Sequence, residues 1–438
     1  MYKRQFNSLT NVQYNNVDTY AVDNPGDFST VFGSRVWNFK ERLIYHPLET
    51  LKLTGRAGYY FRERNKPGDT QDRYRDFNGG LKANYTFNTL SNLEVGYTFD
   101  QYDKSDYQVL YKNDVRDYSN VQHNVHALYN YTFNEKHTLT VGADYLRDYL
   151  MSYQFTDNAN YIMHTADAFG QFDWNPTERL NVIAGLRFDY FSDSNVRHLS
   201  PHLGMMYKIG NCSLRGSYSQ GFRSPTLKEM YMVFNMANMM MIYGNPDLKS
   251  ETSHNFSLSA EYTKNRYNFS VTGYYNLVHN RINTVYSDDP KGQIYTNTEK
   301  VDIAGVDANI SAKYPCGLGF RMSYTYIHEF MRDGQKKFTD TRPHTATVRV
   351  DWGENLDKVD FNYSLNGRIL SEVKTNVYND SFNNPAAGST AVTYPGYMIW
   401  DLTFSVGVFK GVNMNLAINN LFNYVPDYYY FNSPTTTG

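Results

Sequence analysis

Apolar and polar residues alternate along most of this chain with a period of two, the pattern of β-strands that present one apolar face. Within residues 180–190 only Ile183 breaks the alternation. Residues 138–145 and 269–275 follow the same rule. The clearest apolar series is Leu180, Val182, Ala184, Leu186, Phe188 and Tyr190. Because helical spacing is hard to find, the pattern predicts an all-β protein.

Turn signals divide the chain into about 19 candidate strands, many of them longer than the ~9–11 residues that cross a bilayer at a steep tilt. Tight turns alternate with longer polar connections. The tight turns are expected at residues 46–49, 88–92, 134–136, 175–178, 209–211, 264–265, 315–317, 353–357 and 410–411. The longer connections are expected at residues 64–71, 100–117, 225–250, 287–293 and 374–394.

This asymmetry between the two ends of the strands favours a transmembrane antiparallel up-and-down β-barrel, with apolar positions facing lipid and polar positions facing a wet lumen. Excess strand length would project outward with the long connections. A β-propeller fits less well, because a blade has four short strands and each repeat of ~40 residues here holds two long ones.

Composition narrows the class further. No run approaches the ~18 apolar residues of a spanning helix, and 41 Tyr with 27 Phe make the chain too aromatic for a disordered protein. The 42 basic and 44 acidic residues nearly balance, so no nucleic-acid partner is expected. The first residues lack a signal peptide, which indicates either a cytoplasmic protein or a chain that starts inside a longer one.

Few side chains in the sequence indicate catalysis or metal binding. No metalloprotease, nucleophile-elbow, P-loop or dinucleotide motif occurs, so we expect no enzyme, no catalytic residue and no intrinsic cofactor or metal site. His123 and His126 are separated by an odd number of positions and should lie on opposite faces of a strand. Cys212 and Cys316 lie at tight turns about four strands apart, or ~20 Å at ~4.8 Å per strand, so they should be free thiols.

Short motifs in a fixed order carry a family resemblance. They are Phe222, Arg223, Ser224 and Pro225; Asn245, Pro246, Asp247 and Leu248; Glu251-Thr-Ser; and residues 199–207 and 419–423. With these motifs the chain resembles the TonB-dependent outer-membrane receptors. The first two motifs resemble boxes that flank the ligand loop of haem receptors, which usually carry a His between them. This chain has no His there, and the boxes also occur in siderophore and cobalamin receptors.

The resemblance implies a barrel of about 22 strands with a plugged lumen, in a bacterial outer membrane and in contact with membrane lipid. A TonB-type inner-membrane complex would energise import through the plug. The chain itself shows neither a plug nor a partner-contact box, and its last residues, 433–438, are loop-like. Residues 1–438 are therefore expected to be a barrel fragment cut at both ends, with about 19–20 of those strands and without the last one.

The segment 226–244 is the expected ligand contact, because it is unusually rich in flexible apolar side chains. Thioether sulfur can ligate haem iron or a soft metal such as Cu(I). The alternative is an apolar cap that folds back on its neighbours. Arg223 and Asp247 are a candidate ion pair at the base of this loop. The candidate ligand residues are Met230, Tyr231, Met232, Phe234, Met236, Met239, Met240, Met241 and Tyr243.

The sequence thus favours a receptor that imports an iron-containing ligand, such as haem taken free or from a haem-carrying protein. A siderophore or cobalamin receptor of the same family is the first alternative. A passive porin would share the barrel without needing the two boxes, and a soluble sugar-binding or adhesive β protein would need no apolar outward band. The identity of the ligand, ligation of a metal by the methionines and the oligomeric state stay open.

Overall fold

The computed structural model describes residues 5–21, 30–156, 159–192, 195–236, 240–298, 300–330, 336–337, 339, 341–356, 359–379, 385–409 and 412–425. Residues 433–438, which the sequence predicts to be loop-like, lie outside this part of the chain, as do Met239 and the turn residues 410–411.

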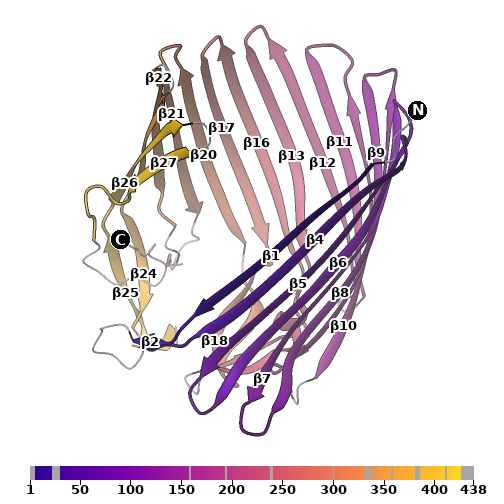
Figure 1. The fold of residues 1–438 in the computed structure, drawn as a ribbon, viewed down its shortest axis with the longest axis vertical. Helices are drawn as coiled ribbons and strands as arrows, with labels where there is room; N and C mark the ends of the chain where they lie inside the picture. The colour runs from indigo at the N-terminus through magenta and orange to yellow at the C-terminus, as the bar shows by residue number, and fades with distance from the viewer. Residues whose placement is uncertain are drawn as a thin grey trace.

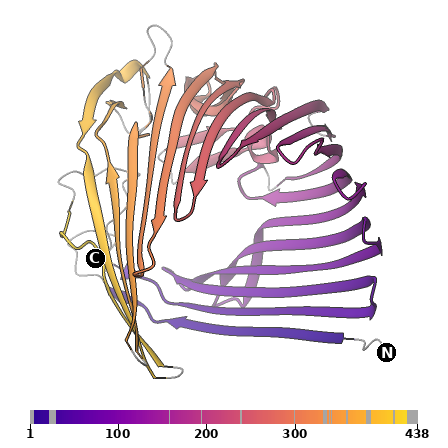
Figure 2. The ribbon, with the colours of Figure 1, turned by 90° about the horizontal axis from the view of Figure 1, so that it is seen from above.

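Nineteen strands form one sheet in which neighbours along the wall pair antiparallel (Figure 1). Seen from above, the sheet curves round into the wall of a barrel (Figure 2). Among the described residues, β1 has its register with β4 and β27 has its register with β26, so these two strands end the series. The all-β barrel and its number of strands are as expected. In order, the wall strands are β1 (Gln5–Val17), β4 (Ser34–Leu48), β5 (Leu51–Lys66), β6 (Thr70–Asn88), β7 (Ser91–Gln108), β8 (Asn113–Phe133), β9 (His137–Ser152), β10 (Asn160–Trp174), β11 (Leu180–Phe191), β12 (Val196–Ile209), β13 (Cys212–Arg223), β16 (Glu251–Lys264), β17 (Tyr267–His279), β20 (Val301–Lys313), β21 (Leu318–Phe330), β22 (His344–Leu356), β23 (Val359–Leu370), β26 (Tyr397–Phe409) and β27 (Val412–Ile418).

Most of the expected tight turns lie at or overlap a junction between consecutive wall strands, at the end of the barrel that is uppermost in Figure 1. The turn expected at residues 353–357 is an exception, because β22 continues to Leu356. The opposite end carries the long connections, which hold short elements of their own. Long loops mark the extracellular end of such barrels. The elements in the connections are β2 (Tyr20–Ala21), β3 (Thr30–Val31), α1 (Leu227–Tyr231), β14 (Val233–Met236), β15 (Met240–Tyr243), β18 (Ile282–Asp288), β19 (Lys291–Asn297), β24 (Val373–Tyr378), the 3-10 turn Pro385–Ala387 and β25 (Ser389–Tyr394).

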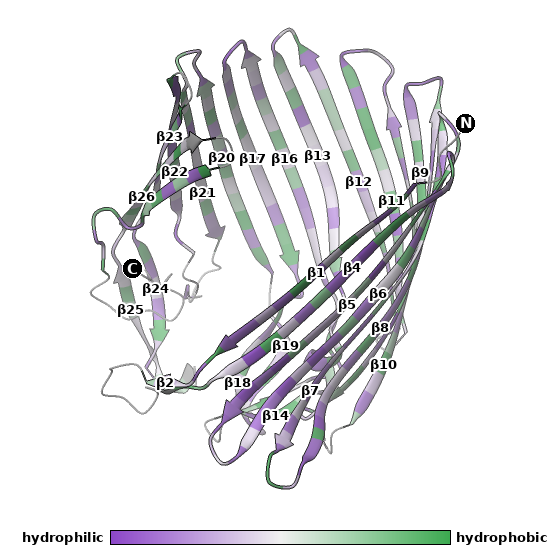
Figure 3. Ribbon diagram, viewed as in Figure 1, coloured by the Kyte–Doolittle hydropathy of each residue, from purple (hydrophilic) through white to green (hydrophobic). Residues whose placement is uncertain are grey.

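Exposure along the wall is inverted relative to a soluble protein. Large apolar side chains such as Leu258, which is 74% exposed, cover one face of the strands. Carboxylates such as Asp189, which is 6% exposed, lie on the other face, where Arg187 bridges it to Asp167. Lipid solvates an apolar surface and a lumen solvates a polar one, so the apolar face points outward. Green and purple residues alternate along the strands accordingly (Figure 3).

Two of the expected long connections are strands instead. β5 continues to Lys66 and β6 begins at Thr70, so only residues 67–69 separate the two strands. β7 and β8 likewise leave only residues 109–112 between them. The polar composition of residues 64–71 and 100–117 was misleading because both faces of these strands are hydrophilic above the membrane. Ion pairs join these strands there, including Arg64 of β5 with Asp72 of β6 at 2.7 Å and Lys66 of β5 with Asp106 of β7 at 3.0 Å.

The helices in the described part of the chain are short, and none could span a membrane. Both cysteines are free, as expected; Cys212 is half-buried and Cys316 is exposed. His123 and His126 do point to opposite faces of β8. His123 lies 2.8 Å from the hydroxyl of Tyr97 on the outward face, and His126 lies 3.4 Å from Glu94 on the lumen face.

Candidate functional site

The connection between β13 and β16 begins with a short capped helix. Thr226 precedes α1, and its hydroxyl accepts a hydrogen bond from the backbone N–H of Glu229, while the Glu229 carboxylate accepts from the N–H of Thr226. This reciprocal capping box satisfies N–H groups that a helix start leaves free. The sequence Thr-Leu-Lys-Glu therefore fixes where the chain leaves the wall and turns over the lumen end.

Residues of α1 belong to a small apolar core at the extracellular end of β9 and β10. Leu227 and Met230, each 2% exposed, pack with Leu150, Phe155 and Met163. The rings of Tyr118, Tyr161, Phe191 and Tyr231 surround this cluster. The apolar cap that the sequence left as an alternative therefore exists around α1.

The second half of the connection is a hairpin that joins another loop. β14 pairs antiparallel with β15, and β15 pairs parallel with β19, which pairs with β18. The four strands form a separate sheet at the extracellular end. Gly244 follows β15 and donates its N–H to the carbonyl of Met232 at 2.5 Å. A Cβ at Gly244 would lie 2.6 Å from the Met232 nitrogen, so only glycine allows this approach.

Arg223 joins the wall to this connection, but not through the partner that the sequence suggested. Its Nη1 lies 2.9 Å from both carboxylate oxygens of Glu229, and its Nη2 lies 2.8 Å from Oε1 of Glu251. Asp247 is exposed and does not contact Arg223; its backbone N–H donates to the side-chain oxygen of Asn245 at 2.9 Å. The predicted Arg223–Asp247 pair is therefore wrong: Glu251 is the direct register partner of Arg223, and the capping box brings Glu229 to it.

The remaining box residues also hold the connection in place. Phe222 stacks on His198 with ring centroids 4.2 Å apart, and Ser224 and Pro225 are buried. Asn245 donates to the carbonyl of Tyr295 in β19 at 3.1 Å. Pro246 is exposed and Leu248 is buried. The two boxes thus anchor the loop connection to the barrel wall and to β19.

The methionines of this connection divide into two groups. Met230 and Met232 are buried, at 2% and 7% exposure. Met236 is 36% exposed, and Met240 and Met241 are half-buried in the hairpin. The aromatic residues are half-buried as well: Phe234 packs edge to face on Tyr153, and Tyr243 closes the hairpin opposite Val233. Met239 lies outside the described residues.

Two ionisable groups of the connection are shifted by burial. Burial lowers the pKa of Lys228, whose ammonium lies 4.9 Å from the centre of the Tyr118 ring. Burial, assisted by the charge of Glu229, raises the pKa of Tyr295. Both shifts follow from partial burial, which disfavours the charged form of each group.

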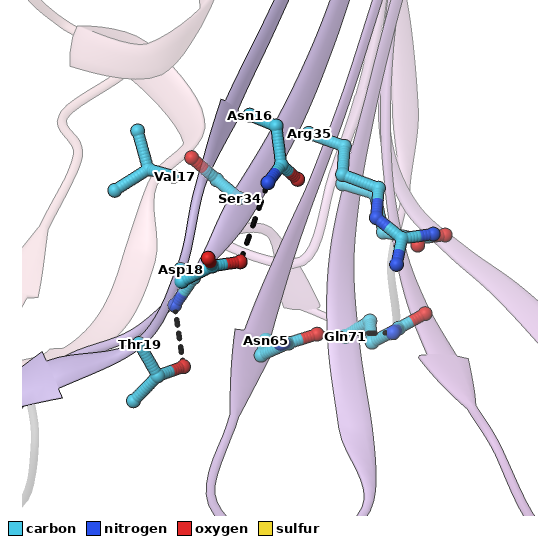
Figure 4. Close-up of a pocket in the computed structure, with 10 residues that line it drawn as sticks. Asn16, Val17, Asp18, Thr19, Ser34, Arg35, Asn65 and Gln71 are labelled. Atoms are coloured by element: carbon cyan, nitrogen blue, oxygen red, sulfur yellow. Dashed lines mark hydrogen bonds between the residues drawn. The ribbon is translucent and has the colours of Figure 1, made fainter.

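A separate polar pocket lies where β1, β4, β5 and β6 meet at the extracellular end (Figure 4). Asn65 accepts a hydrogen bond from Gln71 at 3.1 Å, and Asp18 accepts one from Asn16 at 3.3 Å. The hydroxyl of Thr19 accepts the N–H of Gly33. The last of these bonds ties the segment after β1 to the segment before β4, and none of the expected ligand residues lines the pocket. Nowhere in the described chain do three or more His, Cys, Asp or Glu side chains group as metal ligands.

Comparison with known proteins agrees with the wall and its loops. Residues 2–421 match the family model "TonB dependent receptor-like, beta-barrel". The chain belongs to this family of outer-membrane transport receptors, and its barrel lies in the outer membrane.

Individual relatives are distant. An iron-regulated outer membrane virulence protein of Vibrio cholerae is 24% identical over 278 residues, which cover 58% of this chain and 40% of the relative. The heme/hemopexin utilization protein C of Haemophilus influenzae is 22% identical over 335 residues, which cover 64% of this chain and 44% of the relative. The crystal structure of the siderophore receptor PirA from Acinetobacter baumannii superposes with a TM-score of 0.74 at 15% identity, covering 95% of this chain and 71% of that one. The chain therefore spans less than half the length of these two curated relatives.

Proposed function

We propose that this chain forms the wall and the extracellular loops of a receptor that imports an iron-containing chelate, with haem as the first candidate. The observation that carries the proposal is the hairpin β14–β15, which presents methionine and aromatic side chains at the extracellular end of a barrel of this family. A relative named for heme/hemopexin utilization supports the choice of haem.

Within this connection the buried and the accessible residues have different roles. Met230 and Tyr231 hold α1 in the apolar core and Met232 is buried just after the helix, so their replacement would act through folding of the loop. Met236, Met240, Met241 and Tyr243 remain for contact with a flat, apolar ligand, because Met side chains adapt their shape and are polarizable. Four residues of the two boxes hold the hairpin at the lumen end: Arg223, Ser224, Asn245 and Leu248.

A siderophore receptor of the same family is the second candidate, since a relative of known structure is titled as one. Energy for import would come from a TonB-type inner-membrane complex, as for a family of transport receptors. We infer no enzymatic step and no resident cofactor, because the iron chelate is cargo.

The experiment compares two triple variants at Met236, Met240 and Met241. Leu at all three positions keeps volume and apolarity and removes sulfur, whereas Ser removes both. Leu110→Ser, in the exposed turn after β7, is the control for losing an apolar side chain at another extracellular turn. Haem binding is followed by absorbance in detergent micelles, and uptake is followed as growth of a receptor-deleted strain on single iron sources.

Loss of haem binding with both triple variants supports ligation through sulfur. Loss with Ser alone leaves an apolar contact. Growth on haem that is unchanged by either triple variant removes the hairpin from the binding site. Growth on a ferric siderophore but not on haem, with the unaltered protein, selects the second candidate.

A further inference from the structure

A row of three basic residues crosses β8, β9 and β10. His123 is the direct register partner of Arg147, and Arg147 is the direct register partner of His164. Directly opposed residues of an antiparallel pair have Cβ atoms ~4.5–5.5 Å apart and lie on one face of the sheet. The two imidazoles therefore flank the guanidinium stem on adjacent strands.

The row lies on the outward face. His123 Nδ1 is 2.8 Å from the hydroxyl of Tyr97, and His164 Nδ1 is 2.7 Å from the hydroxyl of Tyr145. Both tyrosines are among the large exposed side chains that cover the outside of the wall. Asp148, which follows Arg147, points the other way and accepts from Asn120 at 2.8 Å.

Among the described residues, the two register rows next to Arg147 on the outward face carry no carboxylate. The rows directly above and below it are built of apolar and aromatic residues, so neither row offers a counter-ion. These two rows are Val121, Tyr149 and Ile162 on one side and Val125, Tyr145 and Ala166 on the other.

The height of the row coincides with the outer boundary of the membrane. Arg147 is ten residues beyond His137, the first residue of β9 after its tight turn. A rise of ~3.3 Å per residue and a tilt of ~40° put it about 25 Å from that turn, which is the height of the apolar band of such barrels. The outward face of β6 turns from Phe77 to the ion-paired Arg75 near this level.

The chemistry of the row fits a phosphate group. When each phenol donates to Nδ1, the ring proton lies on Nε2, so both imidazoles offer a donor beside the guanidinium. Arginine provides a planar fork for phosphate oxygens. Since apolar side chains frame the row and hydrocarbon begins beneath it, a lipid can supply the phosphate while its acyl chains lie on the wall below.

We propose that His123, Arg147 and His164 form a binding site for the phosphorylated headgroup of an outer-leaflet lipid. The same wall provides an internal comparison. Tyr218 contacts His254 at 2.9 Å in the same manner, but the register partners of His254 are Gln220 and Leu277, so no arginine accompanies it. The arginine is what distinguishes the proposed site from an ordinary Tyr–His pair.

Native mass spectrometry of the protein in neutral detergent micelles tests the site, with diphosphorylated lipid A as the probe and the same lipid without phosphates as its control. We expect the unaltered protein to retain the phosphorylated probe, and Arg147→Leu to bind it at least ~10-fold more weakly, as loss of a charge-assisted contact implies. Leu suits a lipid-facing position, and heat-modifiable migration on a gel verifies that the variant is folded.

His254→Gln is the matched control and should retain the probe fully. Arg147→Lys keeps the charge without the fork and should bind with intermediate strength. Equal retention by the unaltered protein and Arg147→Leu would overturn the proposal, as would equal retention of the lipid with and without phosphates. Displacement of the probe by an equimolar amount of inorganic phosphate would also overturn it, because a free anion site would then replace a lipid site.

Discussion

The ring of Tyr231 lies flat on the ring of Tyr161, with centroids 4.0 Å apart and planes 4° from parallel. Tyr231 ends α1 and Tyr161 lies near the start of β10, so the contact fastens the loop helix to the barrel wall. Just beyond it, Val233 donates its N–H to the carbonyl of Gln154 at 2.8 Å. The loop is thus docked on the β9–β10 end by stacked rings and by backbone.

Removing this stack should release the loop without unfolding the barrel. Tyr231→Ala loses an aromatic pair that contributes ~0.5–1.5 kcal/mol beyond burial, so the amides of 231–236 should exchange with solvent about 2- to 10-fold faster. Tyr231→Phe keeps the stacked ring and should exchange more slowly than Tyr231→Ala. Hydrogen exchange with mass spectrometry measures both variants, with Tyr111→Ala in an exposed turn as the control. Unchanged exchange in Tyr231→Ala would show that the stack does not hold the loop.

The ion pairs of Arg223 give a second prediction. Arg223→Gln should loosen the start of α1, and its effect should depend on Glu229, whose carboxylate it contacts. The coupling should be small, at most ~1 kcal/mol, because the guanidinium is well exposed. A double-mutant cycle with Glu229→Gln, read as protection of α1 from protease, measures this term. Asp247→Asn is the control, and a coupling of Arg223 with Asp247 as large as that with Glu229 would contradict the observed pairing.

The two faces of the wall should differ in their tolerance of charge. Leu258 projects outward from β16, whereas Ser257 faces the lumen and contacts Ser217 at 2.7 Å. Because Leu258 lies at the middle of β16 on the lipid face, Leu258→Arg should destabilise the folded barrel by about 2–4 kcal/mol, and Ser257→Arg by much less. A urea titration in lipid vesicles compares the two variants. Equal losses of stability in the two variants would contradict the assignment of the lipid and lumen faces.

Lys228 gives a prediction for pH. Burial lowers its pKa below the ordinary 10.5, so the released loop binds more protons than the docked one between these two values. Docking of the loop should therefore strengthen as the pH rises through that window and stay constant below it. Resistance of residues 226–244 to a protease active at high pH measures the effect, and Lys228→Met should abolish the pH dependence. Docking that weakens as the pH rises through this window would contradict the prediction.

The wall could be predicted from the sequence because the period-two pattern is local. Leu186 and Arg187 already show which face meets lipid, and Gly210 already marks a turn. The extensions of β5 to β8 could not be predicted in this way, because strands above the membrane are wet on both faces and lose the alternation. Their order depends on cross-strand pairs such as Arg73 with Glu63, at 2.8 Å, whose register only the folded sheet reveals.

The partner of Arg223 was missed for a related reason. Asp247 is the acid that the box pattern offers, but Glu251 opposes Arg223 only after the chain has left β13, formed the loop sheet and returned as β16. Glu229 could have been found locally, because Thr-Leu-Lys-Glu is a capping signature that places this carboxylate at the helix start.

The two free thiols can be used to determine which end of the barrel faces the periplasm. Cys316 is exposed at a tight turn, opposite the loop sheet, and Cys212 is half-buried at another such turn. A maleimide too large to pass the outer membrane should label Cys316 in broken cells and spare it in intact ones, since exposure governs the reaction of a thiol. No introduced cysteine is needed, so which end of the barrel faces the periplasm can be read on the unaltered protein in its own envelope.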